Sequence, residues 1–173
     1  MENQANSKSI IVNYGLYLGV SAVLINLVIY AMGMHLDQSW IAGTAGFVIM
    51  IIFIVLGIKK YKEANGGFLS WGQAVKIGVG ISLISALISI VYQQIFNNFI
   101  EPDFMAQTLE KTQQAWVDAG MTEEQIESSL EMTKKMQTPL ILSAMGIIVS
   151  AFIGFIISAI GGAIMKESEE EQY

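Results

Sequence analysis

The chain offers few side chains that could catalyse a reaction or hold a metal ion. Its single histidine, His35, lies two residues before Asp37, a spacing that could bring both side chains to one metal. Catalytic and structural zinc sites require three or four protein ligands, and the chain has no cysteine to supply a thiolate. We therefore expect His35 to be a solvated loop histidine, and we expect no metal site and no cofactor.

A glycine pair near lysines is the second pattern that resembles a chemical motif. Gly66 and Gly67 follow the basic cluster of Lys59, Lys60 and Lys62. A phosphate-binding loop also needs a preceding strand, a following helix and a fuller set of glycines, so the pair is better explained as a turn with unusual backbone angles. Because paired ionisable groups are missing from the apolar segments as well, we predict that the protein is not an enzyme.

Four long apolar stretches must position everything else in the chain. They cover residues 10–34, 40–58, 74–96 and 140–165. About 20 helical residues cross a hydrocarbon core of roughly 30 Å, and apolar runs of this length satisfy their backbone groups in lipid as helices. The one charged residue within them, Lys76, lies close enough to an end for its ammonium group to reach the headgroups. The sequence therefore predicts an all-α membrane protein, a single domain over 1–173 with four transmembrane helices.

Lysine placement sets the expected orientation, since none of the nine basic residues is an arginine. Basic residues concentrate on the cytoplasmic side of membrane proteins, and the densest lysine cluster lies between the second and third stretches. We therefore expect both termini, with the acidic tail 166–173, on the cytoplasmic side of a bacterial inner membrane. The net charge of −6 argues against nucleic acid as a partner. The lysines expected to attract anionic lipid headgroups are Lys59, Lys60, Lys62 and Lys76.

Small residues predict where the helices approach one another. Helices in lipid associate through close packing of small side chains and through interhelical hydrogen bonds. Two alternatives are open for the stripe on the last helix: it assembles the chain's own bundle, or it is a face for self-association. Asn26, about mid-membrane, is expected to find a hydrogen-bond partner on another helix. The other expected packing residues are Gly146, Ser150, Gly154, Ser158 and Gly162 on the fourth stretch and Gly78 and Ser82 on the third.

The segment 97–138 differs sharply in composition, and it predicts an extracytoplasmic amphipathic helical hairpin between helices 3 and 4. Pro102 suits the start of a first helix, Gly120 its end, and Thr122 with Gln125 has the spacing of a capping box that starts a second. Its apolar side chains are too few for a core of their own. The hairpin must therefore rest on the bilayer, its own helices, a second copy or another protein. The residues expected to make this contact are Phe104, Leu109 and Trp116.

Two sequence strings carry a family resemblance. Residues 66–78 read GGFLSWGQAVKIG and residues 120–127 read GMTEEQIE, and a glycine- and serine-rich helix ends the chain. These features resemble the bacterial domain-of-unknown-function family 4199, and the resemblance covers nearly the whole sequence. It implies a small membrane protein with four spans and adds no activity.

The remaining expectation concerns function. We predict a non-catalytic integral membrane protein, an envelope accessory or interaction protein that acts through the outer hairpin. Its expected partners are the lipid bilayer and a second copy or another envelope protein. The alternative is a small-solute carrier or channel formed by an oligomer, with Asn13, Asn26 and the serine rows lining a polar seam.

Overall fold

The computed structural model describes residues 6–36 and 40–167. Within these ranges the chain is helical and forms no strand; a single antiparallel bridge joins Leu69 and Glu167. Four long helices are accompanied by a short π-helix and two shorter helices. In chain order they are α1 (Ser7–Ala31), α2 (Trp40–Ala64), α3 (Trp71–Ile95), η1 (Phe96–Ile100), α4 (Phe104–Asp118), α5 (Glu123–Met136) and α6 (Pro139–Met165).

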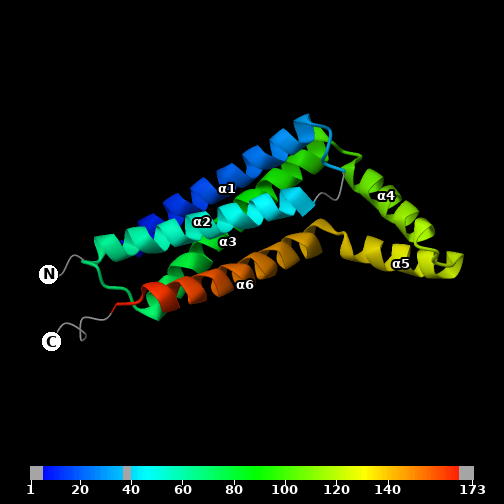
Figure 1. Cartoon of the computed structure of the whole chain (residues 1–173). Coiled ribbons are helices and arrows are strands. Elements are labelled where there is room, and N and C mark those ends of the chain that lie inside the picture. The colour runs from blue at the N-terminus through cyan, green and yellow to red at the C-terminus, as the bar shows by residue number, and fades with distance from the viewer. Residues whose placement is uncertain (1–5, 37–39, 168–173) are drawn as a thin grey trace.

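The long helices α1, α2, α3 and α6 run side by side, and we call them the body (Figure 1). Helix α3 is central, because it packs against each of the other three. The first turn of α1 and the last turn of α6 lie at the same end of the body, and α4 and α5 extend beyond the opposite end. All four helices of the body are long and apolar enough to span a membrane, which indicates a multi-pass membrane protein.

Several helix boundaries differ from those predicted. Helix α1 begins and ends three residues earlier than the predicted stretch 10–34. Helix α2 continues to Ala64, so the lysines predicted for a loop lie on its last turns. Lysine is a good helix former, and its charge is favourable at a helix C-terminus. The helix ends where Gly66 and Gly67 adopt φ angles of +70° and +92°, which glycine reaches without strain. Helix α3 begins at Trp71 because Ser70 and Gln73 form a capping box.

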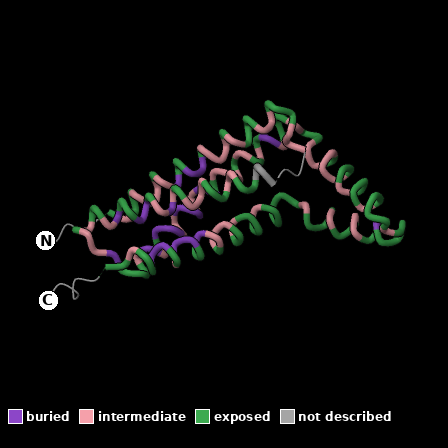
Figure 2. Tube along the Cα trace, in the orientation of Figure 1, coloured by how far each residue is buried: buried purple, intermediate pink, exposed green. Residues whose placement is uncertain are grey.

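The core of the body lies in the half next to the chain ends, where most of the buried residues gather (Figure 2). Its large apolar side chains that are fully buried come from α2, α3 and the loop between them: Ile54, Ile58, Leu69, Ile77 and Ile81. The half of the body next to α4 and α5 has far fewer buried residues. The body is therefore packed tightly at one end and loosely at the other.

Helices α4 and α5, which we call the arm, are joined by a turn at Gly120, whose φ is +77°. The capping box of Thr122 and Gln125 starts α5, as the spacing predicts. The arm projects past the body (Figure 1), and Ile126 is its one buried residue. Its apolar side chains therefore have little cover from the chain itself.

Candidate functional site

The arm exposes large apolar side chains. Val117 and Met132 are 50% and 64% exposed, and Met136 is exposed as well. Leu109 and Trp116, two of the predicted contact residues, are half-buried between the arm's helices and solvent. Exposed apolar groups of this size on a small helical unit favour contact with another surface.

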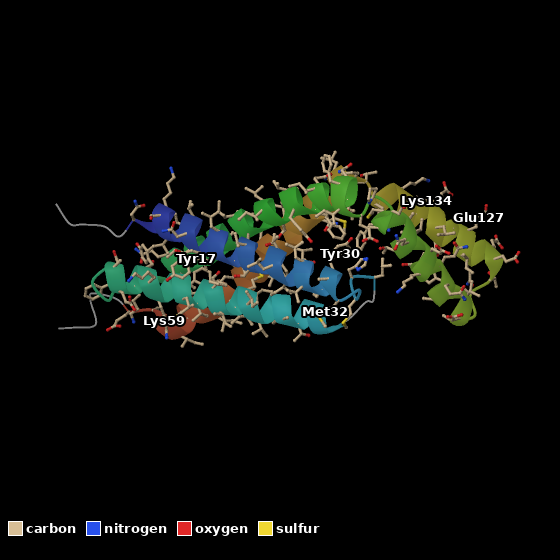
Figure 3. All side chains as sticks on the ribbon, turned by 90° about the horizontal axis from the view of Figure 1, so that it is seen from above. Tyr17, Tyr30, Met32, Lys59, Glu127 and Lys134 are labelled. Atoms are coloured by element: carbon tan, nitrogen blue, oxygen red, sulfur yellow. The ribbon has the colours of Figure 1, made fainter. Side chains whose placement is uncertain are left out.

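Charge is distributed unevenly along the arm. Its tip carries four exposed carboxylates, and no basic residue lies between Lys111 and Lys134 in the sequence. Figure 3 shows Glu127 farther from the body than Lys134, which lies on the part of α5 nearer the body. The tip is therefore strongly negative. Its carboxylates are those of Asp118, Glu123, Glu124 and Glu127.

An aromatic cluster joins the arm to the body. Phe96 of η1 lies at its centre, with ring centroids 5.2 Å from Tyr30 and 5.3 Å from Phe104, both in edge-to-face geometry. His35 lies 4.8 Å from the ring centroid of Tyr30. Such edge-to-face pairs contribute about 0.5–1.5 kcal/mol each beyond their burial. Phe104, predicted as a contact for another surface, therefore anchors the arm to its own body.

His35 is not the solvated histidine that the sequence predicts. Its Nε2 lies 3.2 Å from Oε2 of Glu101, and both side chains are only 17% exposed. The ring nitrogens are buried and have no aligned hydrogen bond, so the contact is an ion pair only when the imidazole is protonated. The expectation is wrong because the rings of Tyr30, Phe96 and Phe104 cover His35. The available signal was Glu101 itself, an acid at the same end of the apolar stretches.

The predicted pairing of His35 with Asp37 lies outside the described residues, because Asp37 is not among them. Across 6–36 and 40–167, no three His, Cys, Asp or Glu side chains lie close enough to hold one metal ion.

The small residues predicted for packing join α3 to α6 within one chain. A Cβ atom at Gly78 would overlap Ser158, and one at Gly154 would overlap Ser82. Each of these serines donates to a carbonyl of its own helix, so no hydroxyl is left unpaired in the seam. In this seam an interhelical hydrogen bond comes from Ser150, whose Oγ donates to the carbonyl of Ser82 over 3.1 Å.

Gly162 and Gly146 lie at opposite ends of this stripe and differ in their surroundings. A Cβ at Gly162 would lie 2.7 Å from that of Ala74, whereas one at Gly146 would meet nothing within 4 Å. The seam therefore covers the half of α6 next to the chain end, and Gly146 is not part of it. The reason is that α3 and α6 separate toward the arm (Figure 1).

Asn26 does not hold two helices together. Its side chain is exposed, and Nδ2 donates to the carbonyl of Ala22 on the same helix over 2.9 Å. The expectation of a partner on another helix is wrong, because a carbonyl four residues earlier can accept from the amide.

Two of the lysines predicted to meet lipid headgroups have carboxylate partners. Lys62 lies 2.6 Å from Glu167 and Lys60 lies 3.3 Å from Glu63. Lys59 and Lys76 are exposed, and the structure records no ion pair for them among the described residues. Figure 3 shows Lys59 at the end of the body away from the arm.

The pair of Lys62 and Glu167 is part of a closure between the α2–α3 loop and the end of α6. Leu69 and Glu167 exchange two backbone hydrogen bonds of 3.0 Å. Trp71 donates from Nε1 to the carbonyl of Ala159 over 3.1 Å, and its ring meets that of Phe155 edge-on. This end of α6 is therefore fixed to the loop.

Comparison with known proteins gives a family and no activity. No curated protein and no solved structure matches the chain. The resemblance seen in the sequence is confirmed: the family described as protein of unknown function, DUF4199, matches residues 13–167, and the chain belongs to it.

Proposed function

We propose that this protein is a non-catalytic integral membrane protein of the bacterial inner membrane, an accessory protein that binds another envelope protein through its arm. One observation carries the proposal: the arm extends beyond the body with its large apolar side chains exposed (Figure 1). Two helices of 15 and 14 residues are far too small to sustain a core. A surface outside the chain would therefore cover the exposed apolar side chains of the arm.

The proposed orientation leaves the arm outside the cytoplasm. What supports it is the lysine cluster on the last turns of α2, at the end of the body away from the arm. Basic residues of this kind remain on the cytoplasmic side during insertion. Both chain ends would then be cytoplasmic, and the arm would reach into the extracytoplasmic space.

The charges on the arm narrow the class of partner. Its tip carries Asp118, Glu123, Glu124 and Glu127 in a stretch of sequence without lysine, and on the same arm Val117 and Met132 are exposed. Complementary charges steer association and select partners. The proposed partner is therefore a protein with an apolar strip rimmed by lysine or arginine.

The test is photo-crosslinking from single positions in native membranes. A crosslinker at Met132 should give one protein adduct, whereas the same group at Ile148, which is 66% exposed on α6, should react with lipid. Reversing the charge of the tip in Glu123→Lys with Glu124→Lys should remove the protein adduct while leaving the lipid adduct unchanged.

Two results contradict the proposal. One is an adduct at position 132 that consists of lipid alone, which would place the arm on the bilayer surface. The other is a protein adduct that survives the charge reversal, since the negative tip would then have no part in choosing the partner. Accessibility of a cysteine at Lys60 from the outside would in addition reverse the orientation.

A further inference from the structure

The body contains a cavity that the proposed function does not use. It lies between α3 and α6, where these helices separate toward the arm, and it has a volume of about 830 Å³. Ligand sites in proteins typically have volumes of about 300–1,000 Å³. Its α3 wall carries Ser85, Ser89 and Gln93 and continues into η1 with Asn97, and its α6 wall carries Ser143 and Gly146.

The cavity opens toward lipid. None of its lining residues belongs to α1 or α2. The long walls are α3 and α6, both long enough to span a membrane, and residues of the arm close the outer end. We infer that the side left open between α3 and α6 faces the bilayer. From Ser85 in α3 to Asn98 in η1 this wall runs for about 20 Å at a helical rise of 1.5 Å per residue. This length is close to half of a bilayer that measures about 40–45 Å with its headgroups, so the cavity is about one leaflet deep.

The chemistry of the lining changes along this length. Side-chain amides gather at the arm end, where the side-chain amides of Gln94 and Gln137 have no hydrogen-bond partner among the described residues. Toward the middle of the body the lining residues are mostly small, with Ala86, Ile90 and Gly146 beside the hydroxyls of Ser85, Ser89 and Ser150. Amide groups donate hydrogen bonds to phosphate and ester oxygens, and small side chains leave room for an acyl chain.

One positive charge lies at the polar end. Lys134 is the single charged residue of the lining, and it has no ion pair within the described part of the chain. Its neighbour Lys135 lies outside the lining and is paired with Glu131 at 2.7 Å. Figure 3 shows Lys134 on the part of the arm nearest the body. The cavity is therefore cationic and amide-rich at one end and lined mostly by small side chains at the other.

We propose that this cavity binds a membrane phospholipid with an anionic headgroup. The phosphate lies near Lys134 and the amides of Gln94 and Gln137, and an acyl chain enters between α3 and α6 beside Gly146. A phospholipid is the occupant because one molecule matches the depth of a leaflet, the charge at the mouth and the opening toward the bilayer. The site is separate from the partner-binding surface of the arm.

The experiment uses the full chain in lipid nanodiscs. Because the protein has no cysteine, a single cysteine can be introduced and labelled without other changes. A fluorophore at Met145→Cys, beside the cavity on α6 but outside its lining, reports nitroxide-labelled phosphatidylglycerol or phosphatidylcholine added as a minor component to phosphatidylcholine discs. We expect phosphatidylglycerol to quench at several-fold lower mole fraction. A fluorophore at Val48→Cys on α2 should show no such preference.

Matched variants separate the cavity from general surface charge. Lys134→Gln should lower the preference for phosphatidylglycerol about fivefold, the effect expected of one lysine near a lipid surface. Lys135→Gln should leave it unchanged. Gly146→Leu should fill the cavity and abolish the preference, whereas Gly46→Leu, which also has open space around its Cβ, should have no effect.

Four results would overturn the proposal. Equal quenching by both lipids would show that the site does not select an anionic headgroup. Quenching by neither lipid would mean that protein fills the cavity, as a second copy would. Displacement of the nitroxide lipid by soluble glycerol phosphate would assign the site to a soluble anion, and equal effects of Lys134→Gln and Lys135→Gln would reduce the preference to surface charge.

Discussion

Replacing Gly154 by alanine is the most direct test of how α3 and α6 are held together. The added Cβ would overlap the side chain of Ser82, and it would also lie 3.3 Å from the carbonyl oxygen of Gly78. Ser82 is fully buried and hydrogen-bonded to that same carbonyl, so it has no open space to move into. The two helices must therefore move apart.

The expected cost follows from that movement. Overpacking a well-filled interior by one methyl group typically costs about 1–3 kcal/mol. Separation of the helices also lengthens the hydrogen bond from Ser150 to the Ser82 carbonyl, and interhelical hydrogen bonds in membranes contribute about 0.6 kcal/mol on average. We expect Gly154→Ala to lower the free energy of unfolding by about 2–3 kcal/mol.

The same helix supplies the control. Gly146→Ala adds the same methyl group where nothing lies within 4 Å, so we expect no loss of stability. Reversible unfolding in mixed micelles, followed by tryptophan fluorescence, measures both variants. Adding Ser82→Gly to Gly154→Ala should recover most of the loss, because it removes the atoms that the new Cβ meets. Equal stability of Gly154→Ala and Gly146→Ala would refute the close approach of the two helices, and so would a double variant no better than the single one.

The remaining predictions concern the loop and the junction. Ser70→Ala should lower the free energy of unfolding by about 1 kcal/mol in the same assay, because the backbone N–H of Gln73 loses the Ser70 hydroxyl that accepts from it. Gly67→Ala should cost about 1–2 kcal/mol, because the φ angle of Gly67 is +92°. Gly72→Ala should cause no such loss, because Gly72 lies within a helix and has open space around its Cβ. Equal losses in the two variants would contradict backbone strain as the cause. Glu101→Gln removes the charge beside His35 and should speed hydrogen exchange at the start of α4, while the exposed Asp103→Asn should leave the exchange rate unchanged.

The sequence predicts the helices of the body well because their existence depends on local properties. Apolar length alone requires a helix in lipid, and the capping boxes at Ser70 and Thr122 require residues only three positions apart. The end of α2 was missed because lysines that terminate an apolar run can still extend a helix. Apolar length and capping residues therefore predict that a helix exists, whereas apolar composition alone predicts poorly at which residue it ends.

Contacts between elements needed information that a single sequence does not carry. Gly146 and Gly154 belong to the same four-residue repeat, yet only Gly154 packs against α3, since the repeat does not encode where two helices separate. His35 and Glu101 are brought together by the fold of η1 and the aromatic cluster around Phe96. The cavity was missed for the same reason, because its two walls are far apart in the sequence.

The closure between Glu167 and the α2–α3 loop fixes one end of α6 and leaves the other end able to tilt. One end is fastened by Lys62 and Leu69, and the other continues through Pro139 into α5 without a long connection. An outward tilt of α6 would widen the gap beside Gly146 and rotate the tip of α5 by the same angle. The width of the gap beside Gly146 and the position of the carboxylates at the tip of the arm would therefore both depend on the tilt of α6.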